Sequence, residues 1–316
     1  MKQKTLEGWE AVATTTVLPR VAALRRFARE LRRGGDAECL HQTRVACRRV
    51  RSALGAFEDY LGKRARKWRK RIRGVTRVLG CARDLDVQME FVRGWIEDQE
   101  DPAIRAGPRR LLSYLASRRR KAQVALEGAL EEIERTGVLD RIEEVADRTL
   151  ERVGRKRARE FRPLAHRLAR EAVLGEVRAV LRYEEFVSRP ECVEELHQMR
   201  IAAKRLRYTL EIFASWHEKD LGSALAVSKR LQGLLGEIHD CDVWIEFLPR
   251  FLHMERRRAA GRDGPHLARI AAGVGRVRED RRRERERLHG KLRRLWRRWK
   301  KAGKWSKIAK SVRDAS

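Results

Sequence analysis

The chain has 316 residues, of which 38% are charged and 42% hydrophobic, and its formal net charge is +30. This composition excludes an intrinsically disordered chain, and no apolar run approaches the roughly 18 residues that a membrane-spanning helix needs. So large a positive charge repels itself unless a polyanion neutralises it. Nucleic acid, an anionic membrane surface and an inorganic polyanion are therefore the expected classes of partner.

The cysteines and the N-terminus indicate a cytoplasmic protein. The five cysteines include no C-x-x-C pair. They are typical of reduced thiols, not of a disulfide framework or a zinc site. The first ten residues, Met1 to Glu10, contain no apolar segment for export. We therefore expect the cytoplasm, and no membrane span.

Helical periodicity runs through most of the chain, which contains only 7 prolines, and this predicts an all-α fold. Gly34 and Gly35 are expected to end the first helix, and Asp36 to cap the second. Turns are expected at 98–108 and 261–265. The expected helices, in chain order, are 9–33, 36–62, 63–79, 109–135, the acidic segment 137–152 with Gly154 as the bridge between halves, 157–188, a helix containing 197–213, 225–235, and a long last helix.

The second helix carries a basic stripe in the motif His41-Gln-Thr-Arg-Val-Ala-Cys-Arg-Arg-Val-Arg51. At about 100° per residue, four side chains fall within about a quarter-turn, and apolar residues from Ala46 to Phe57 occupy the other side. Like charges at these spacings repel each other, so an anion is expected beside them. We call the four residues the first stripe: His41, Arg44, Arg48 and Arg51.

The motif recurs 156 positions later as His197-Gln-Met-Arg-Ile-Ala-Ala-Lys-Arg-Leu-Arg207, with eight of seventeen positions identical between 41–57 and 197–213. A solvated face would not need to repeat its charged residues. The segment 79–91 also recurs at the same offset, as 235–247. These repeats predict a tandem duplication into halves 1–153 and 154–316. We call the second set of basic residues the second stripe: His197, Arg200, Lys204 and Arg207.

The repeated segment 79–91 contains aspartates whose role the sequence leaves open. They could bind a hard cation. The favoured interpretation is structural: one aspartate caps a helix that follows Gly80 or Gly236, and the other orients a stripe side chain. His239-Asp240 suggests a metal phosphohydrolase, but Arg83 stands at the matching position of the first half. The four aspartates concerned are Asp84, Asp86, Asp240 and Asp242.

No sequence motif indicates catalysis. The chain contains no P-loop, H-E-x-x-H or G-x-S-x-G pattern. Gly273-Val-Gly275 is an isolated G-x-G in a helical context and is too weak to use. We therefore predict no catalytic residue, no bound metal and no cofactor.

The paired H-x-x-R-[VI]-x-x-[RK]-R-[LV]-R motifs, each followed by L-G-x-x-[RH]-D-x-D-V, resemble the CHAD family, the conserved histidine α-helical domains. The resemblance covers about Gly8 to Lys304. It implies two bundles of roughly four helices each, related by a pseudo-twofold axis, with a basic central groove or pore that binds inorganic polyphosphate without catalysis at polyphosphate granules. The ligands it implies are His41, Arg44, Arg48, Arg49, Arg51, His197, Arg200, Lys204, Arg205 and Arg207, with Arg73, Arg77, Lys229 and Arg230 as a second tier.

The physical chemistry of polyphosphate fits this expectation. A thin, flexible anion can lie between two stripes, and arginine forks can bind its oxygens in pairs. Sulfate or phosphate ions should occupy the same place in crystals. Single-stranded RNA would favour exposed aromatic residues, which are 6% of the chain in total and mostly lie at apolar positions.

Two alternatives stay open at this point. The first is general binding of RNA or DNA, favoured by the basic residues of the last helix; under the polyphosphate hypothesis nucleic acid is only a non-specific competitor. The second is a metal-dependent polyphosphate or triphosphate hydrolase that uses the aspartates. The basic residues of the last helix are Arg283, Arg287, Arg294, Arg298 and Lys301.

Overall fold

The computed structural model of the chain describes residues 2–153, 162–214, 221–259 and 264–313. Every regular element in these ranges is a helix, which confirms the predicted all-α class. The helices are α1 (Lys2–Arg32), α2 (Ala37–Ala56), α3 (Glu58–Leu61), α4 (Lys63–Glu97), α5 (Pro102–Arg135), α6 (Val138–Val153), α7 (Arg162–Leu181), the 3-10 helix η2 (Glu184–Ser188), α8 (Val193–Phe213), α9 (Gly222–Arg258), α10 (Pro265–Lys301) and α11 (Lys304–Arg313).

A first helical bundle is built from α1, α2, α4 and α6 with the second part of α5. Its core includes Leu24 of α1, Leu54 of α2, Ile72 of α4, Leu130 of α5 and Ile142 of α6, each at most 2% exposed. Burial of these apolar side chains supplies the main driving force for packing the helices together. The apolar sides that the sequence predicted for α2 and α4 therefore face this core.

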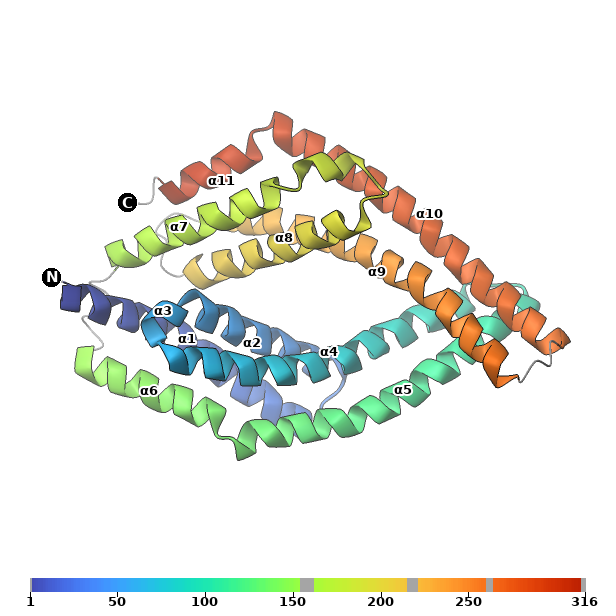
Figure 1. Cartoon of the computed structure of the whole chain (residues 1–316), viewed down its shortest axis with the longest axis horizontal. Coiled ribbons are helices and arrows are strands. Elements are labelled where there is room, and N and C mark those ends of the chain that lie inside the picture. Colours follow the sequence, from blue (N-terminus) through green and yellow to red (C-terminus); the bar gives the residue numbers. More distant parts are fainter. Residues whose placement is uncertain (1, 154–161, 215–220, 260–263, 314–316) are drawn as a thin grey trace.

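A second bundle is built from α7, α8, α9 and α11 with the second part of α10. Its core includes Val177 of α7, Leu206 of α8, Leu231 of α9, Leu292 of α10 and Ile308 of α11. The two bundles lie one above the other in Figure 1, with α2 beside α8 where they meet. The two helices that carry the stripes are therefore neighbours in space.

The bundles are joined at both ends of the molecule. At one end, α4, α5, α9 and α10 share a core that contains Trp95, Leu115, Phe251 and Val274. The corner of the diamond-shaped outline where α5 and α10 meet is this joint (Figure 1). At the other end, α1, α7 and α8 pack around Phe57 in a smaller apolar cluster. The middle of the molecule thus lies between two apolar joints.

Several predicted helix boundaries are confirmed, and one class of boundary is wrong. Asp36 caps α2, with its Oδ1 accepting a 2.8 Å hydrogen bond from the Cys39 amide, and Gly34 adopts a φ of 92° after α1. However, Gly80 and Gly236 lie inside α4 and α9, which continue through the aspartate segments to Glu97 and Arg258. The predicted helices 63–79 and 225–235 are therefore too short, and no aspartate there caps a helix.

The two internal glycines lie at helix–helix contacts instead. A Cβ at Gly80 would lie 3.7 Å from Nε of Arg44, and one at Gly236 would lie 4.0 Å from Nε of Arg200. Both distances are ordinary van der Waals contacts, so alanine would also fit at the two positions. Each glycine therefore marks where a stripe arginine lies close to the neighbouring helix.

The predicted turn at 98–108 is too long. Helix α5 begins at Pro102 after the cap residue Asp101, and Pro108 lies inside it. Proline at the first helical position is favourable, because its missing N–H would have no partner there. Pro108 lies beside Gly273 of α10, where the helices cross at the distance of backbone contact. Tertiary packing therefore overrides the usual reading of proline as a helix breaker.

Two further segments differ from expectation. The helix predicted at 157–188 ends at Leu181 and is followed by the 3-10 helix, and the long last helix is divided at Gly303, whose φ is 60°. The expected helix start at residue 157, the bridge at Gly154 and the turn at 261–263 lie outside the described residues. In the ranges that are described, no helix is long and apolar enough to cross a bilayer.

Candidate functional site

The two basic stripes act on each other across the contact between the bundles. Repulsion from Arg48 lowers the pKa of Arg200. Repulsion from Arg44, Arg48 and Arg51 of the first stripe likewise lowers the pKa of Lys204 in the second. These residues are separated by about half of the chain in sequence. Folding therefore brings cations from both halves into one electrostatic cluster.

A groove of about 750 Å³ opens beside this cluster, between the first and second bundles. We call it the central groove. Its floor includes apolar side chains of α7 and α8, such as Leu168 and Phe213. Among the described residues that line it, the one acid is Glu176, which pairs with Arg205 at 3.3 Å. Its basic lining residues are Arg48, Arg51, Arg66, Arg69, Lys70, Arg73, Lys204 and Arg205.

The pKa of Lys204 reflects the positive electrostatic potential in the central groove. Burial, followed by repulsion from Arg48 and Arg200, lowers the pKa of Lys204 from 10.5 to about 8. Adding a proton to this ammonium group is therefore much less favourable than in water. A bound anion would reverse the effect, because it would offset the neighbouring positive charges.

The arginines of the cluster are desolvated without full compensation. Burial is the largest cause of the lowered pKa values of Arg44, Arg51 and Arg200, and neighbouring arginines lower them further. The Nε atoms of Arg44 and Arg51 are buried and donate to no acceptor in the described part of the chain. An unpaired buried donor is costly, so these groups favour a ligand that brings oxygen acceptors.

The aspartates are bound to arginines, but not in the way the sequence suggested. Asp84 lies 3.3 Å from Arg44, as expected for a residue that orients the stripe. Asp240 acts on Arg200 at the matching position of the second half. Asp86 instead pairs with Arg119 of α5 at 2.7 Å, and Asp242 with Arg285 of α10. Only one aspartate of each repeat therefore acts on a stripe arginine.

Each stripe begins with a histidine that has a different environment. Burial, together with Arg83, Arg44 and Arg48, lowers the pKa of His41 despite an opposing effect of Glu38. Nδ1 of His197 lies 3.2 Å from Nδ1 of His239, at hydrogen-bond distance, so the ring whose Nδ1 carries the hydrogen donates and the other accepts. Burial and Arg200 lower the pKa of His239 to about 4, so this ring is neutral at pH 7.

Other predicted site residues are placed elsewhere. Arg49 of α2 pairs with Glu211 of α8 at 3.3 Å and so bridges the bundles, and Arg207 pairs with the same carboxylate at 3.3 Å within α8. Arg77, Lys229 and Arg230 are exposed and lie outside the lining of the central groove. The lining also excludes four further stripe residues that the sequence predicted as ligands: His41, Arg44, His197 and Arg200. Arg73 does line it.

The prediction of ligands omitted three lining residues on α4: Arg66, Arg69 and Lys70. The signal was present in the sequence, since these residues follow the helical period on the side opposite to Trp68 and Ile72. What the sequence lacked was the position of that side relative to the stripes. The central groove thus draws half of its basic lining residues from α4, which carries neither stripe.

Comparisons with known proteins agree with this architecture. The crystal structure of the CHAD domain from the plant Ricinus communis superimposes with a TM-score of 0.56, at 22% identity, over 84% of this chain and 91% of that one. Among proteins with curated descriptions, none shows detectable sequence similarity. The family model of the CHAD domain matches residues 16–249, which include both stripes and both aspartate segments. The chain therefore belongs to the CHAD family.

Proposed function

We propose that the protein binds inorganic polyphosphate in the central groove and does not cleave it. The observation that carries this proposal is the lining of the central groove, in which basic side chains from both halves meet and the one acid among the described lining residues is Glu176. Burial, followed by repulsion from Arg48 and Arg200, lowers the pKa of Lys204 there to about 8. The positive side chains of this cluster repel one another, so binding of a polyanion stabilises it. The family to which the chain belongs supports a role related to polyphosphate.

The shape and composition of the central groove suit a thin, repetitive anion. Arg48 and Arg51 of α2, Lys204 and Arg205 of α8 and a basic row of α4 line it together. Each phosphate unit offers oxygens to the planar guanidinium groups, which bind such oxygens in pairs. Many weak contacts along one chain act multivalently, so affinity should increase with polyphosphate length until the groove is filled.

General nucleic-acid binding is less well supported by the last helices. Arg283 and Arg287 of α10 pair with Glu279 and Glu284 of the same helix. The aromatic residues Trp296, Trp299 and Trp305 are buried and so cannot stack on bases. The basic character of α10 is thus partly compensated within the helix.

A hydrolase that uses the aspartates is also less well supported. Asp86 and Asp242 are held by Arg119 and Arg285, side chains that compete with any cation. Within the described ranges, no three His, Cys, Asp or Glu side chains form a group that could hold a metal ion. Asp86 and Asp242 therefore act as counter-ions of the arginines with which they pair.

A pair of charge reversals tests the proposal. Arg48→Glu combined with Lys204→Glu should weaken polyphosphate binding by about 100-fold, because two attractive contacts become repulsive. The control is Arg294→Glu combined with Arg298→Glu, which changes the net charge equally on exposed positions of α10. Fluorescence anisotropy with labelled polyphosphate gives both affinities, and circular dichroism verifies the helical content.

Two outcomes would contradict the proposal. The proposal fails if both double variants lose affinity equally, because binding would then follow net charge alone. It also fails if polyphosphate cannot displace RNA or DNA from the unaltered protein. In the cell, we expect the protein at cytoplasmic polyphosphate granules, and the Arg48/Lys204 variant dispersed.

A further inference from the structure

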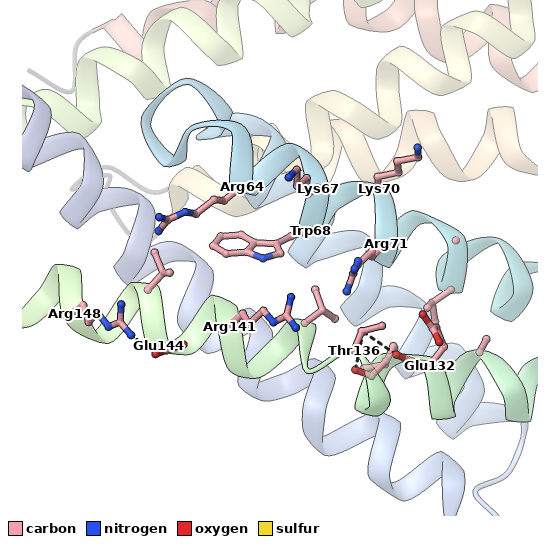
Figure 2. A pocket seen from close by; sticks show the side chains of 16 residues that line it. Arg64, Lys67, Trp68, Lys70, Arg71, Glu132, Thr136, Arg141, Glu144 and Arg148 are labelled. Carbon is pink, nitrogen blue, oxygen red and sulfur yellow. Dashed lines mark hydrogen bonds and ion pairs between the residues drawn. The ribbon is translucent and has the colours of Figure 1, made fainter.

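A second groove of about 910 Å³ lies on the outer side of the first bundle, between α4 and α6. We call it the lateral groove; Figure 2 shows it with Trp68 between a row of cations on α4 and another on α6. Its basic residues are Arg64, Lys67, Lys70 and Arg71 on α4 and Arg141 and Arg148 on α6. Its apolar residues are Trp68, Val75, Ala129, Ile133, Val138 and Val145.

The lining of the lateral groove repeats with a seven-residue period on both walls. On α4, Arg64 precedes Arg71 by seven residues, and Trp68 precedes Val75 by seven. On α6 the same spacing separates Val138 from Val145 and Arg141 from Arg148. Seven residues are about two helical turns, or roughly 10.5 Å. The repeat is the one with which helices pack side by side.

The charge of the lateral groove is only partly compensated. Glu144 pairs with Arg148, and Glu132 pairs with Arg135 beyond the groove at 2.5 Å. The remaining cations form no ion pair with the described residues: Arg64, Lys67, Lys70, Arg71 and Arg141. The apolar residues between the basic rows form an apolar strip at the bottom of the groove: Ala129 and Val145 are half-buried, and the others are buried. The uncompensated basic rows therefore favour an acidic partner.

We propose that the lateral groove docks an amphipathic, acidic α-helix of a partner protein. Apolar side chains at heptad positions would cover the strip from Trp68 to Val145, and flanking carboxylates would face the basic rows. The lining of α4 from residue 64 to 75 spans about 16 Å, which matches three turns of a bound helix. Polyphosphate is a poorer occupant, because it would cover the apolar strip with a fully charged chain.

Gly74 provides a steric test of this docking site. It lines the lateral groove, and a Cβ placed there meets no atom within 4 Å. A side chain can therefore leave the backbone at Gly74 without a clash and project into the groove, and leucine is the better helix former by roughly 0.8 kcal/mol. The matched control is Gly275→Leu on α10, where a Cβ also meets no atom within 4 Å.

The probe is a labelled synthetic peptide of three heptads, with Leu at positions a and d and Glu at e and g, together with a peptide that carries Lys at e and g. The Glu peptide should bind the full chain saturably, and the Lys peptide should not. Gly74→Leu and Arg71→Glu combined with Arg141→Glu should each weaken binding at least tenfold, whereas Gly275→Leu should leave it unchanged. Melting temperature verifies that each variant is folded.

Three results would overturn the inference. In the first, the Glu peptide binds Gly74→Leu as tightly as the unaltered protein but no longer binds the Arg48/Lys204 variant. This result would place the peptide in the central groove. The second is equal binding of the Lys peptide. In the third, Gly74→Leu no longer binds phosphatidylglycerol vesicles but still binds the Glu peptide. This result would indicate that the lateral groove binds a membrane surface. Polyphosphate affinity, measured alongside, should not change in Gly74→Leu, so the two proposals fail separately.

Discussion

Phe57 and Phe213 meet edge to face between the two bundles, with ring centroids 6.1 Å apart and an interplanar angle of 65°. Both side chains are fully buried. They occupy matching positions of the two stripe motifs, at the ends of α2 and α8. The contact therefore helps to fix how closely the two stripes approach one another.

This contact should appear as an energetic coupling between the two positions. Phe57→Leu and Phe213→Leu should together show a coupling energy of about 0.5–1.5 kcal/mol in a double-mutant cycle, because an aromatic pair of this geometry exceeds simple burial. Urea unfolding of the four proteins measures it. As the control, Phe57→Leu combined with Phe251→Leu, whose sites lie in separate cores, should be additive. Coupling near zero for the first pair would show that the rings pack independently.

The pH dependence of polyphosphate binding should follow Lys204. The free protein loses this proton as the pH rises through about 8, whereas bound phosphate holds it, so affinity falls with increasing pH. We expect about tenfold weaker binding at pH 9 than at pH 7, the limit for one proton with this pKa. Isothermal titration calorimetry at several pH values gives the profile.

Lys204→Arg is the informative control for this profile. Arginine stands at the matching position of the first stripe, Arg48, and stays charged throughout this range. The variant should bind with nearly the same affinity at pH 7 and pH 9. An equally steep profile in Lys204→Arg would assign the titration to another group.

Two glycines two residues apart on α10 should respond oppositely to alanine. A Cβ at Gly273 would overlap the carbonyl oxygen of Ile104 and lie 2.8 Å from Cδ of Pro108, whereas one at Gly275 meets no atom within 4 Å. Gly273→Ala should therefore lower the free energy of unfolding by about 1–3 kcal/mol, since α5 and α10 must separate. Gly275→Ala should raise it by up to about 1 kcal/mol. Urea unfolding distinguishes the two, and equal effects would contradict the close crossing.

Asp84 should weaken polyphosphate binding by offsetting the charge of Arg44. The pair is 3.3 Å apart and the Asp84 side chain is 63% exposed. Asp84→Asn should bind polyphosphate about twofold to fivefold more tightly at low salt, because it removes a negative charge that offsets Arg44, whose charge acts on Lys204 in the central groove. Binding assays with and without Mg²⁺, combined with phosphate release, check this. Hydrolysis by the unaltered protein that Asp84→Asn abolishes would instead make Asp84 a catalytic residue.

The sequence predicted correctly those helix boundaries that depend only on neighbouring residues. Asp36 as a cap and Gly34 as a helix end depend on neighbouring residues in the chain, and both were predicted correctly. Gly80, Gly236 and Pro108 were misread as boundaries. The helices continue because residues beyond these positions, such as Val92, Leu111 and Leu248, are buried in a core that α4, α5, α9 and α10 share.

The sequence by itself determined that the chain is helical, that its charge demands an anionic partner, and that basic side chains are grouped on single sides of helices. These properties follow from the helical period and from composition, which need no knowledge of distant contacts. Only the tertiary structure decided which basic sides share a groove: it joined α4 to the stripes, tied Arg49 and Arg207 to Glu211, and left the space between α4 and α6 open. The physical reason is that a groove is formed by the packing of segments far apart in the chain, and helical periodicity does not encode their relative rotation.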